Sequence, residues 1–196
     1  MIIIDRYLVH GAYTVLFLVL GVFSLKVFLN PGHCVGLDSG AGGYGITEAE
    51  TAFKIACKVR DYLQAVNYDV YLFQFDGLEE IVTESNLWRS DLFVSIHCNA
   101  LDGTVRGTET FYCGSYDGER LANCIQNQIL AKLPTVNRGV KDKNFYVIKY
   151  TDCPAVLVET AFIDNVDDNA LLVEREDDFA RAIALGITDY VKAYAS

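Results

Sequence analysis

The feature that most constrains this chain is a regular alternation of strand-like and helix-like segments that begins at Lys26. Short apolar runs rich in β-branched and aromatic residues are typical of strands, and longer amphipathic stretches are typical of helices. These patterns follow one another as a strand at 26–30, a helix at 48–66, a strand at 69–74, a short helix at 78–88 and a strand at 91–97. A strand, a helix and a second strand in this order form the usual unit of a parallel sheet.

The second half of the chain continues the pattern. Further strands are predicted at 107–113, 145–148 and 155–159, and further helices at 118–133 and 179–194. The last helix carries an apolar stripe at helical spacing, formed by Phe179, Ile183, Ile187, Tyr190 and Tyr194. With 196 residues, of which 52% are hydrophobic, the chain can bury one core of ordinary size. We therefore predict an α/β fold: a single domain with a mostly parallel, twisted central sheet covered by helices on both faces.

The N-terminal segment differs from the rest of the chain. Residues 12–25 are almost wholly apolar but too short to span a bilayer comfortably, and both Asp5 and Arg6 precede them. This pattern resembles an imperfect signal peptide, and an uncleaved membrane anchor or a misassigned start are the alternatives. We expect an apolar segment at 1–25, as signal peptide or anchor, followed by a folded domain at 26–196. Export to the cell envelope or the extracellular space is the favoured localisation, with membrane anchoring as the alternative.

The charge of the chain limits its partners. The net charge is -10 and the sequence pI is about 4.7, and the Lys and Arg residues are scattered rather than gathered on one face. This argues against nucleic acid as a partner. A polymeric substrate would have to be held by a shaped groove rather than by general charge attraction. No obligate protein partner is evident from the sequence, and we expect a monomer.

The cysteines do not form a recognisable framework. There are six of them, dispersed and without any C-x-x-C pair, at positions 34, 57, 98, 113, 124 and 153. A domain of this size does not need disulfide bonds to fold, so we expect mostly free thiols.

Polar residues stand at the predicted strand ends. His33 follows the first strand within a glycine-rich loop, His97 ends the third strand, and Glu159 ends the last strand. Glu48 opens the first helix directly after the glycine-rich loop. In parallel α/β sheets, ligands bind beyond the carboxyl ends of the strands. We therefore expect these four side chains to lie on one rim of the sheet.

Two imidazoles and one carboxylate, with a fourth position open to water, are the ligands of hydrolytic zinc sites. Here they predict one Zn²⁺ ion bound by His33, Glu48 and His97, with Glu159 as the general base. Each residue taken alone has a simpler structural role, such as a hydrogen bond, a favourable helix-dipole interaction or a salt bridge. A catalytic site is favoured only because all four side chains are predicted to lie on the same rim of the sheet.

Glu50 competes with Glu48 for the carboxylate position. Thr47 and Glu50 fit a capping box, in which Thr47 is the N-cap and Glu50 stands three residues later. Glu50 therefore has a structural role already, and Glu48 is the better ligand candidate.

Two cysteines stand beside the histidines, and thiolate is a good zinc ligand. Cys34 lies in the loop and stays an alternative ligand. Cys98 directly follows His97 in a strand, where successive side chains point to opposite faces, so we assign Cys98 to packing.

Six different sequence motifs follow one another along the chain in a characteristic order. They are Leu29-Asn30-Pro31-Gly32-His33, Glu48 after Gly45, the run from Asp91 to Ala100 that contains His97, Gly107-Thr108-Glu109-Thr110, Arg138-Gly139-Val140-Lys141 and the run from Pro154 to Glu159. From about Lys26 to its end, the chain resembles the zinc-dependent N-acetylmuramoyl-L-alanine amidases of bacterial cell-wall hydrolases. The resemblance implies a zinc amidase catalytic domain at 26–196 that cleaves the amide bond between N-acetylmuramic acid and L-alanine in peptidoglycan.

The resemblance implies the same site residues as the strand-end argument: zinc at His33, Glu48 and His97, and Glu159 as the catalytic glutamate. Regulated relatives carry a long helical insert over the site, whereas here only residues 101–106 separate the two strands concerned, so we expect an open groove. The alternative functions are a zinc peptidase acting on free peptides and a non-catalytic peptidoglycan-binding module.

Two further residues are candidates for substrate binding. These are Asn99 and Arg138, although Asn99 could instead cap a turn and Arg138 could pair with surface acids. The chain also departs from the family pattern at three positions. The family often has Asp where this chain has Asn30, Gly where it has Cys34 and Arg where it has Phe75. Changes at Asn30 and Cys34 would affect the surroundings of the metal ligands rather than the ligands themselves.

Overall fold

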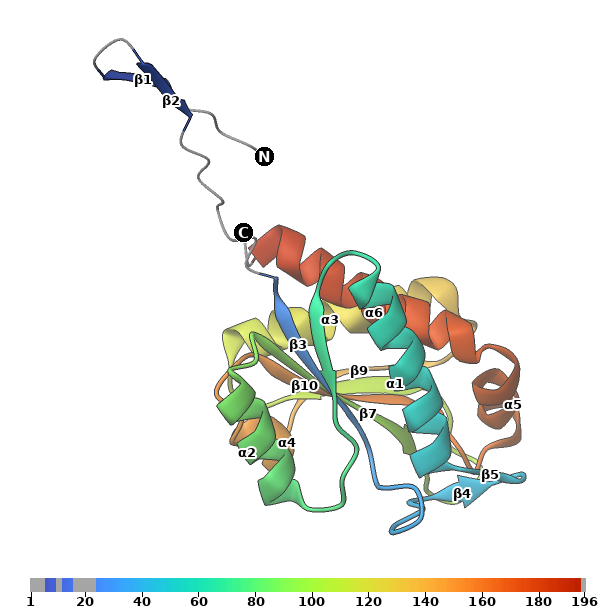
Figure 1. Cartoon of the computed structure of the whole chain (residues 1–196). Helices are drawn as coiled ribbons and strands as arrows, with labels where there is room; N and C mark the ends of the chain where they lie inside the picture. The colour runs from blue at the N-terminus through green and yellow to red at the C-terminus, as the bar shows by residue number, and fades with distance from the viewer. Residues whose placement is uncertain (1–5, 10–11, 16–23, 195–196) are drawn as a thin grey trace.

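A six-stranded sheet runs through the protein, with helices on both of its faces (Figure 1). The structure is a computed structural model that describes residues 6–9, 12–15 and 24–194. The strand order is β6-β3-β7-β10-β8-β9. The bounds are β3 (Lys26–Pro31), β6 (Asp69–Leu72), β7 (Leu92–Asn99), β8 (Thr108–Tyr112), β9 (Asn137–Asp142) and β10 (Ala155–Phe162). Every neighbouring pair in this sheet is parallel except β10 and β8, so the predicted fold class is confirmed.

The helices divide between the two faces of the sheet (Figure 1). One face is covered by α1 (Glu48–Gln64), α3 (Tyr116–Lys132) and α6 (Glu176–Tyr194). The other face carries α2 (Leu78–Trp88) and the short α4 (Tyr146–Lys149). A further helix, α5 (Val166–Glu174), follows β10 and was not predicted from the sequence.

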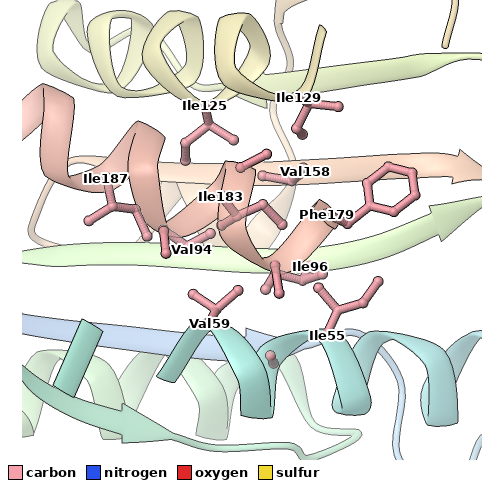
Figure 2. Close-up of a cluster of buried hydrophobic side chains, with 14 of the residues drawn as sticks. Ile55, Val59, Val94, Ile96, Ile125, Ile129, Val158, Phe179, Ile183 and Ile187 are labelled. Carbon is pink, nitrogen blue, oxygen red and sulfur yellow. The ribbon is translucent and has the colours of Figure 1, made fainter. Parts of the chain in front are cut away.

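The larger core lies between the sheet and the helices α1, α3 and α6 (Figure 2). Each helix contributes a stripe of β-branched or aromatic side chains to it, and burying one such side chain stabilises the fold by about 2 kcal/mol. The labelled members are Ile55, Val59, Val94, Ile96, Ile125, Ile129, Val158, Phe179, Ile183 and Ile187. The predicted stripe of the last helix is buried up to Tyr190, whereas Tyr194 is 48% exposed.

A smaller aromatic core lies on the opposite face. Phe28 of β3 stacks on Phe93 of β7 with ring centroids 5.6 Å apart, and both side chains are fully buried. Val147 and Ile148 of α4 complete this core together with Ile81 of α2. These contacts fix α2 and α4 beside the carboxyl ends of the central strands.

The predicted strand at 145–148 is wrong. Residues 146–149 form α4, and the strand of this region is β9, whose sequence is mostly polar. β9 lies at the edge of the sheet and pairs only with β8 within the described part of the chain. An edge strand can be half exposed, so it needs no apolar run, and the apolar run at 145–148 is buried from a helix instead.

Two small hairpins complete the described structure. β4 (Gly42–Gly43) pairs with β5 (Ile46–Thr47), and β1 (Arg6–Val9) pairs with β2 (Ala12–Val15). The predicted signal peptide or anchor at 1–25 falls largely on residues outside the described ones, so it stays a prediction. In the ranges that are described, no helix combines the length and apolarity that membrane crossing requires.

Candidate active site

Three predicted ligands converge at the carboxyl ends of β3 and β7. Glu48, at the first position of α1, is 4% exposed and lies between the two histidines. Its Oε2 is 3.1 Å from Nε2 of His33, and its Oε1 is 2.9 Å from Nδ1 of His97. The candidate ligand atoms of the three residues all lie within 4.8 Å of one another. The structure therefore brings together the residues that the strand-end argument selected.

Local backbone geometry allows this close approach. His33 adopts a left-handed conformation with φ 57°, which turns the chain sharply after β3. A Cβ atom on Gly32 would lie 2.3 Å from the His97 ring, and one on Gly40 would lie 2.5 Å from the His33 ring. Glycine at these two positions leaves the space that the imidazoles occupy.

A single tetrahedral metal ion fits this group. Metal–nitrogen and metal–oxygen bonds of about 2.0–2.1 Å imply ligand atoms roughly 3.3 Å apart in a zinc site. The separations of 3.1 Å from Oε2 of Glu48 to His33 and 2.9 Å from its Oε1 to His97 are close to that spacing, and the ligand atoms of the three residues lie within 4.8 Å of one another. The donor set of two imidazoles and a carboxylate is also the one that leaves a fourth position open.

Asp38 orients His33 from the side away from Glu48. Its Oδ2 lies 2.5 Å from Nδ1 of His33, which leaves Nε2 directed at the candidate metal position. Such a carboxylate behind a histidine fixes the ring orientation in metal sites. The hydrogen bond to Glu48, together with that to Asp38, raises the pKa of His33 to about 9 against the opposing effect of burial. Burial also opposes ionisation of Glu48, but the bonds from both histidines outweigh it and hold the pKa of Glu48 well below its ordinary value.

Glu159 lies beside the ligand group. It pairs in register with His97 on the neighbouring parallel strand, so both side chains emerge on the same face of the sheet. Its Oε2 is buried and has no hydrogen-bond partner among the described residues. Burial therefore dominates and raises the pKa of Glu159 to about 7. A carboxylate with such a pKa can both accept and return a proton near neutral pH.

A groove of about 410 Å³ opens over these residues. Its polar side is formed by His33, His97 and Glu159. Its other side is apolar and comes from β10, α2, α4 and the segments before these helices, with Phe75, Leu78, Phe145, Tyr146 and Leu157 in the lining. The connection from β7 to β8 is short, with β7 ending at Asn99 and β8 beginning at Thr108.

Asn99 and Arg138 meet at a residue that the sequence reasoning missed. Nδ2 of Asn99 donates a 2.8 Å hydrogen bond to Oε1 of Glu109, and Nε of Arg138 lies 3.5 Å from the same oxygen. Glu109 is 4% exposed and stands directly opposite Glu159 in the antiparallel β8–β10 pair. Lys141 pairs with its other oxygen. Glu109 lies in the motif Gly107-Thr108-Glu109-Thr110, but its place inside a strand gave no indication of its role.

The competing carboxylate lies away from the ligand group. The hydroxyl of Thr47 accepts a hydrogen bond from the backbone N–H of Glu50, which confirms Thr47 as the N-cap, and Glu50 itself is exposed.

Neither neighbouring cysteine joins the ligand group. Cys98 is buried in the main core, and burial raises the pKa of its thiol, so it stays protonated and is a poor metal ligand. Cys34 forms a tight backbone turn with Asp38 and is not among the clustered ligand atoms of the described residues. All six thiols are free.

Asn30, where the family often has Asp, has a structural role in this chain. Its side chain accepts a 2.9 Å hydrogen bond from the Ser95 hydroxyl and donates to the carbonyl of Phe73. It therefore ties β3 to its neighbouring strand β7 and to the chain segment that follows β6, and it is 2% exposed.

Comparison with known proteins agrees with this geometry. Residues 27–189 match the sequence profile of a family described as N-acetylmuramoyl-L-alanine amidase. AmiC2 of Nostoc punctiforme, an N-acetylmuramoyl-L-alanine amidase, has the same fold with a TM-score of 0.81 and 33% sequence identity, over 86% of this chain and 97% of that chain. The fold and the matching profile thus place the chain in the amidase class of proteins.

Sequence relatives narrow this class to one family. The N-acetylmuramoyl-L-alanine amidase LytC of Bacillus subtilis (strain 168) is 41% identical over 176 residues, which is 85% of this chain but only 35% of LytC. The uncharacterized protein YqiI of the same organism is 39% identical over 173 residues, 84% of each chain. The chain belongs to the N-acetylmuramoyl-L-alanine amidase family.

Proposed function

We propose that this protein is a zinc hydrolase that cleaves the amide bond between N-acetylmuramic acid and L-alanine in peptidoglycan. The observation that carries the proposal is the position of Glu159, which is half-buried with its Oε2 enclosed, paired in register with His97, and adjacent to a compact group of two histidines and a carboxylate. The sequence relatives named above and the shared fold support the choice of substrate.

His33, Glu48 and His97 would hold the metal ion, with Asp38 orienting His33. A zinc ion bound there would polarise the scissile carbonyl and increase the acidity of a water molecule. The buried carboxylate of Glu48 supplies negative charge to balance the cation.

Glu159 acts as the general base and then as the general acid. Its carboxylate accepts a proton from the attacking water as the oxygen bonds to the carbonyl carbon. The same proton passes to the nitrogen of L-alanine when the amide bond breaks, which restores the carboxylate.

The groove would hold the polymer without a strong general charge. Its apolar wall, which includes Phe75 and Tyr146, suits the apolar faces of sugar rings. Asn99 and Arg138 would contact the substrate on the opposite side of Glu159. We propose action in the cell envelope or outside the cell as a monomer, with peptidoglycan as the only partner that the site requires.

Mass spectrometry of digested peptidoglycan tests this function. Purified peptidoglycan is incubated with the zinc-loaded protein, with the protein treated with a chelator, and with a buffer control. Release of intact stem peptides that begin at L-alanine, only with the zinc-loaded protein, is the expected result. In a parallel reaction the same stem peptides, without the sugar, should stay intact.

The alternatives predict different products. Cleavage inside free stem peptides would indicate a zinc peptidase. Tight binding to peptidoglycan without any product, despite one bound zinc per chain, would indicate a binding module and would contradict the proposed hydrolysis.

A further inference from the structure

Beyond Glu159, a second cluster of charged residues extends along the same edge of the sheet. Its centre is Glu109 on β8, a carboxylate that is 4% exposed. Lys141 and Arg138, both on β9, form ion pairs with its two oxygens, and Asn99 of β7 donates a hydrogen bond to it. In the described part of the chain, none of these residues belongs to a candidate metal site.

The cluster carries one more positive charge than negative charge. Within the described residues, Arg138 and Lys141 form ion pairs with no acid other than Glu109, so two cations share one carboxylate. The side chains of Arg138 and Lys141 are 31% and 38% exposed, which leaves both accessible to a ligand. In a chain with a net charge of -10, such a local excess of positive charge beside the groove favours an anionic group.

Arg138 is held in place but has donors to spare. Its guanidinium lies 4.9 Å from the ring centre of Phe162, and its Nε faces Glu109. Among the described residues, no hydrogen bond uses its terminal nitrogens Nη1 and Nη2. A guanidinium that is fixed on one edge and free on the other can donate two parallel hydrogen bonds to a carboxylate.

The distance between Glu159 on β10 and the two cations on β9 indicates which part of the substrate would reach the cluster. β8 is next to β10 and β9 is next to β8, so two strand spacings of about 4.8 Å place β9 about 10 Å from β10. An extended peptide advances about 3.4 Å per residue, so this distance corresponds to two or three residues beyond the scissile bond. The apolar groove lies on the other side, towards α2 and α4.

We propose that Arg138 and Lys141, held by Glu109, form a subsite for a free carboxylate of the stem peptide, two or three residues beyond the bond that is cut. This inference rests on the proposed function and adds an orientation to it. The peptide runs from Glu159 over β8 towards β9, and the glycan lies in the apolar groove.

Two soluble muramoyl tripeptides test the subsite. The two substrates have the same sequence. In one, every carboxyl group of the second and third residues that is not part of a peptide bond is a free acid. In the other, each of these groups is a primary amide. The zinc-loaded wild-type protein should cleave the free acid with a KM about tenfold lower, as expected for a charge-assisted contact. A difference in KM rather than in kcat indicates binding rather than chemistry.

Variants at Lys141 test whether the cluster causes the preference for the free-acid substrate. Lys141→Met should bring the two KM values to within about twofold of each other, and Lys141→Arg should restore the preference because the charge is kept. Lys192→Met is the matched control and should keep the tenfold preference. Lys192 lines a depression beside Leu63 and Tyr68, at the end of α1 that lies about 25 Å from Glu48.

Contrary outcomes are distinguishable. Equal KM values for the two substrates in the wild-type protein, or an unchanged preference in Lys141→Met, would overturn the subsite while leaving the amidase activity established. Cleavage of neither substrate would contradict the proposed function, and the subsite would fall with it.

Discussion

The surroundings of Glu159 disfavour its charged form, so this side chain costs stability at neutral pH. One of its oxygens is buried without a hydrogen-bond partner among the residues that the structure describes, and burial raises the pKa of the metal-free site's Glu159 to about 7 from an ordinary value of 4.5. Between those two values the folded protein keeps a proton on Glu159 that the unfolded chain has released. The stability contributed by this group therefore falls as the pH rises from 4.5 to 7.

Replacing this residue should stabilise the metal-free protein. At pH 8, Glu159→Gln should increase the free energy of unfolding by about 3 kcal/mol, because the amide carries no charge to bury. The gain should shrink as the pH falls and vanish below about pH 4.5, where both states of the wild-type protein are protonated. Urea unfolding of chelator-treated proteins at pH 8 and pH 4.5 measures the difference. Equal stability at pH 8 would mean that the carboxylate is not desolvated.

Glu48 is expected to be the carboxylate ligand. Glu48→Gln should weaken zinc affinity by at least about 100-fold, because a neutral amide replaces the charged donor between His33 and His97. Glu50→Gln is the matched control, two residues away and exposed, and should change zinc affinity by less than about twofold. Competition with a chromogenic chelator measures both. Similar losses in the two variants would exclude a special role for Glu48.

The convergence of the four strand-end residues could be predicted from sequence because each follows a strand or opens a helix. Parallel strands place such positions on one rim whatever the details of packing. Glu109 could not be found in this way. It lies inside β8, and its partners come from β7 and β9, so its surroundings depend on a strand order that no local pattern encodes.

At the scale of the elements, the loop after β3 decides the ligand geometry. Gly32→Ala should lower zinc affinity and activity by about tenfold or more, because the added Cβ would lie 2.3 Å from the His97 ring and displace it. Gly42→Ala, in the β4–β5 hairpin before α1, is the control, since its Cβ would meet only a carbonyl oxygen at 3.4 Å. Zinc titration and amide hydrolysis report the effect, with thermal unfolding as the check on folding. Wild-type zinc affinity in Gly32→Ala would contradict this account.

The predicted elements were most accurate where an apolar pattern and burial agree. The strands at 26–30 and 155–159 lie inside the sheet, the helix at 48–66 buries one face against it, and they match β3, β10 and α1 to within a few residues. The error at 145–148 arose because an apolar run does not distinguish a short buried helix from a strand. The polar strand β9 exists because β8 offers it a free edge, which is a tertiary effect.

At the scale of the whole molecule, the domain from Ser24 onward contains the complete sheet, both cores and the site. Removing residues 1–23 should therefore leave a folded and active domain. We expect its midpoint of thermal unfolding to lie within about 2 °C of that of the full chain, because Ser24 and Leu25 keep their contacts with Asn67 and Asp69. Circular dichroism and hydrolysis of peptidoglycan measure this. An unfolded or aggregated product would show that the N-terminal segment belongs to the fold.

In the proposed function, Glu159 transfers protons beside a metal ion held by His33, Glu48 and His97. The most direct test compares zinc content and turnover of the wild-type protein and Glu159→Gln at pH 7. We expect one zinc ion per chain in both proteins, with kcat reduced by a factor of about 10² to 10⁴ in the variant, as for removal of a general base. A variant that hydrolyses the amide at the wild-type rate would contradict the claim. So would a variant whose loss of activity is explained by loss of zinc.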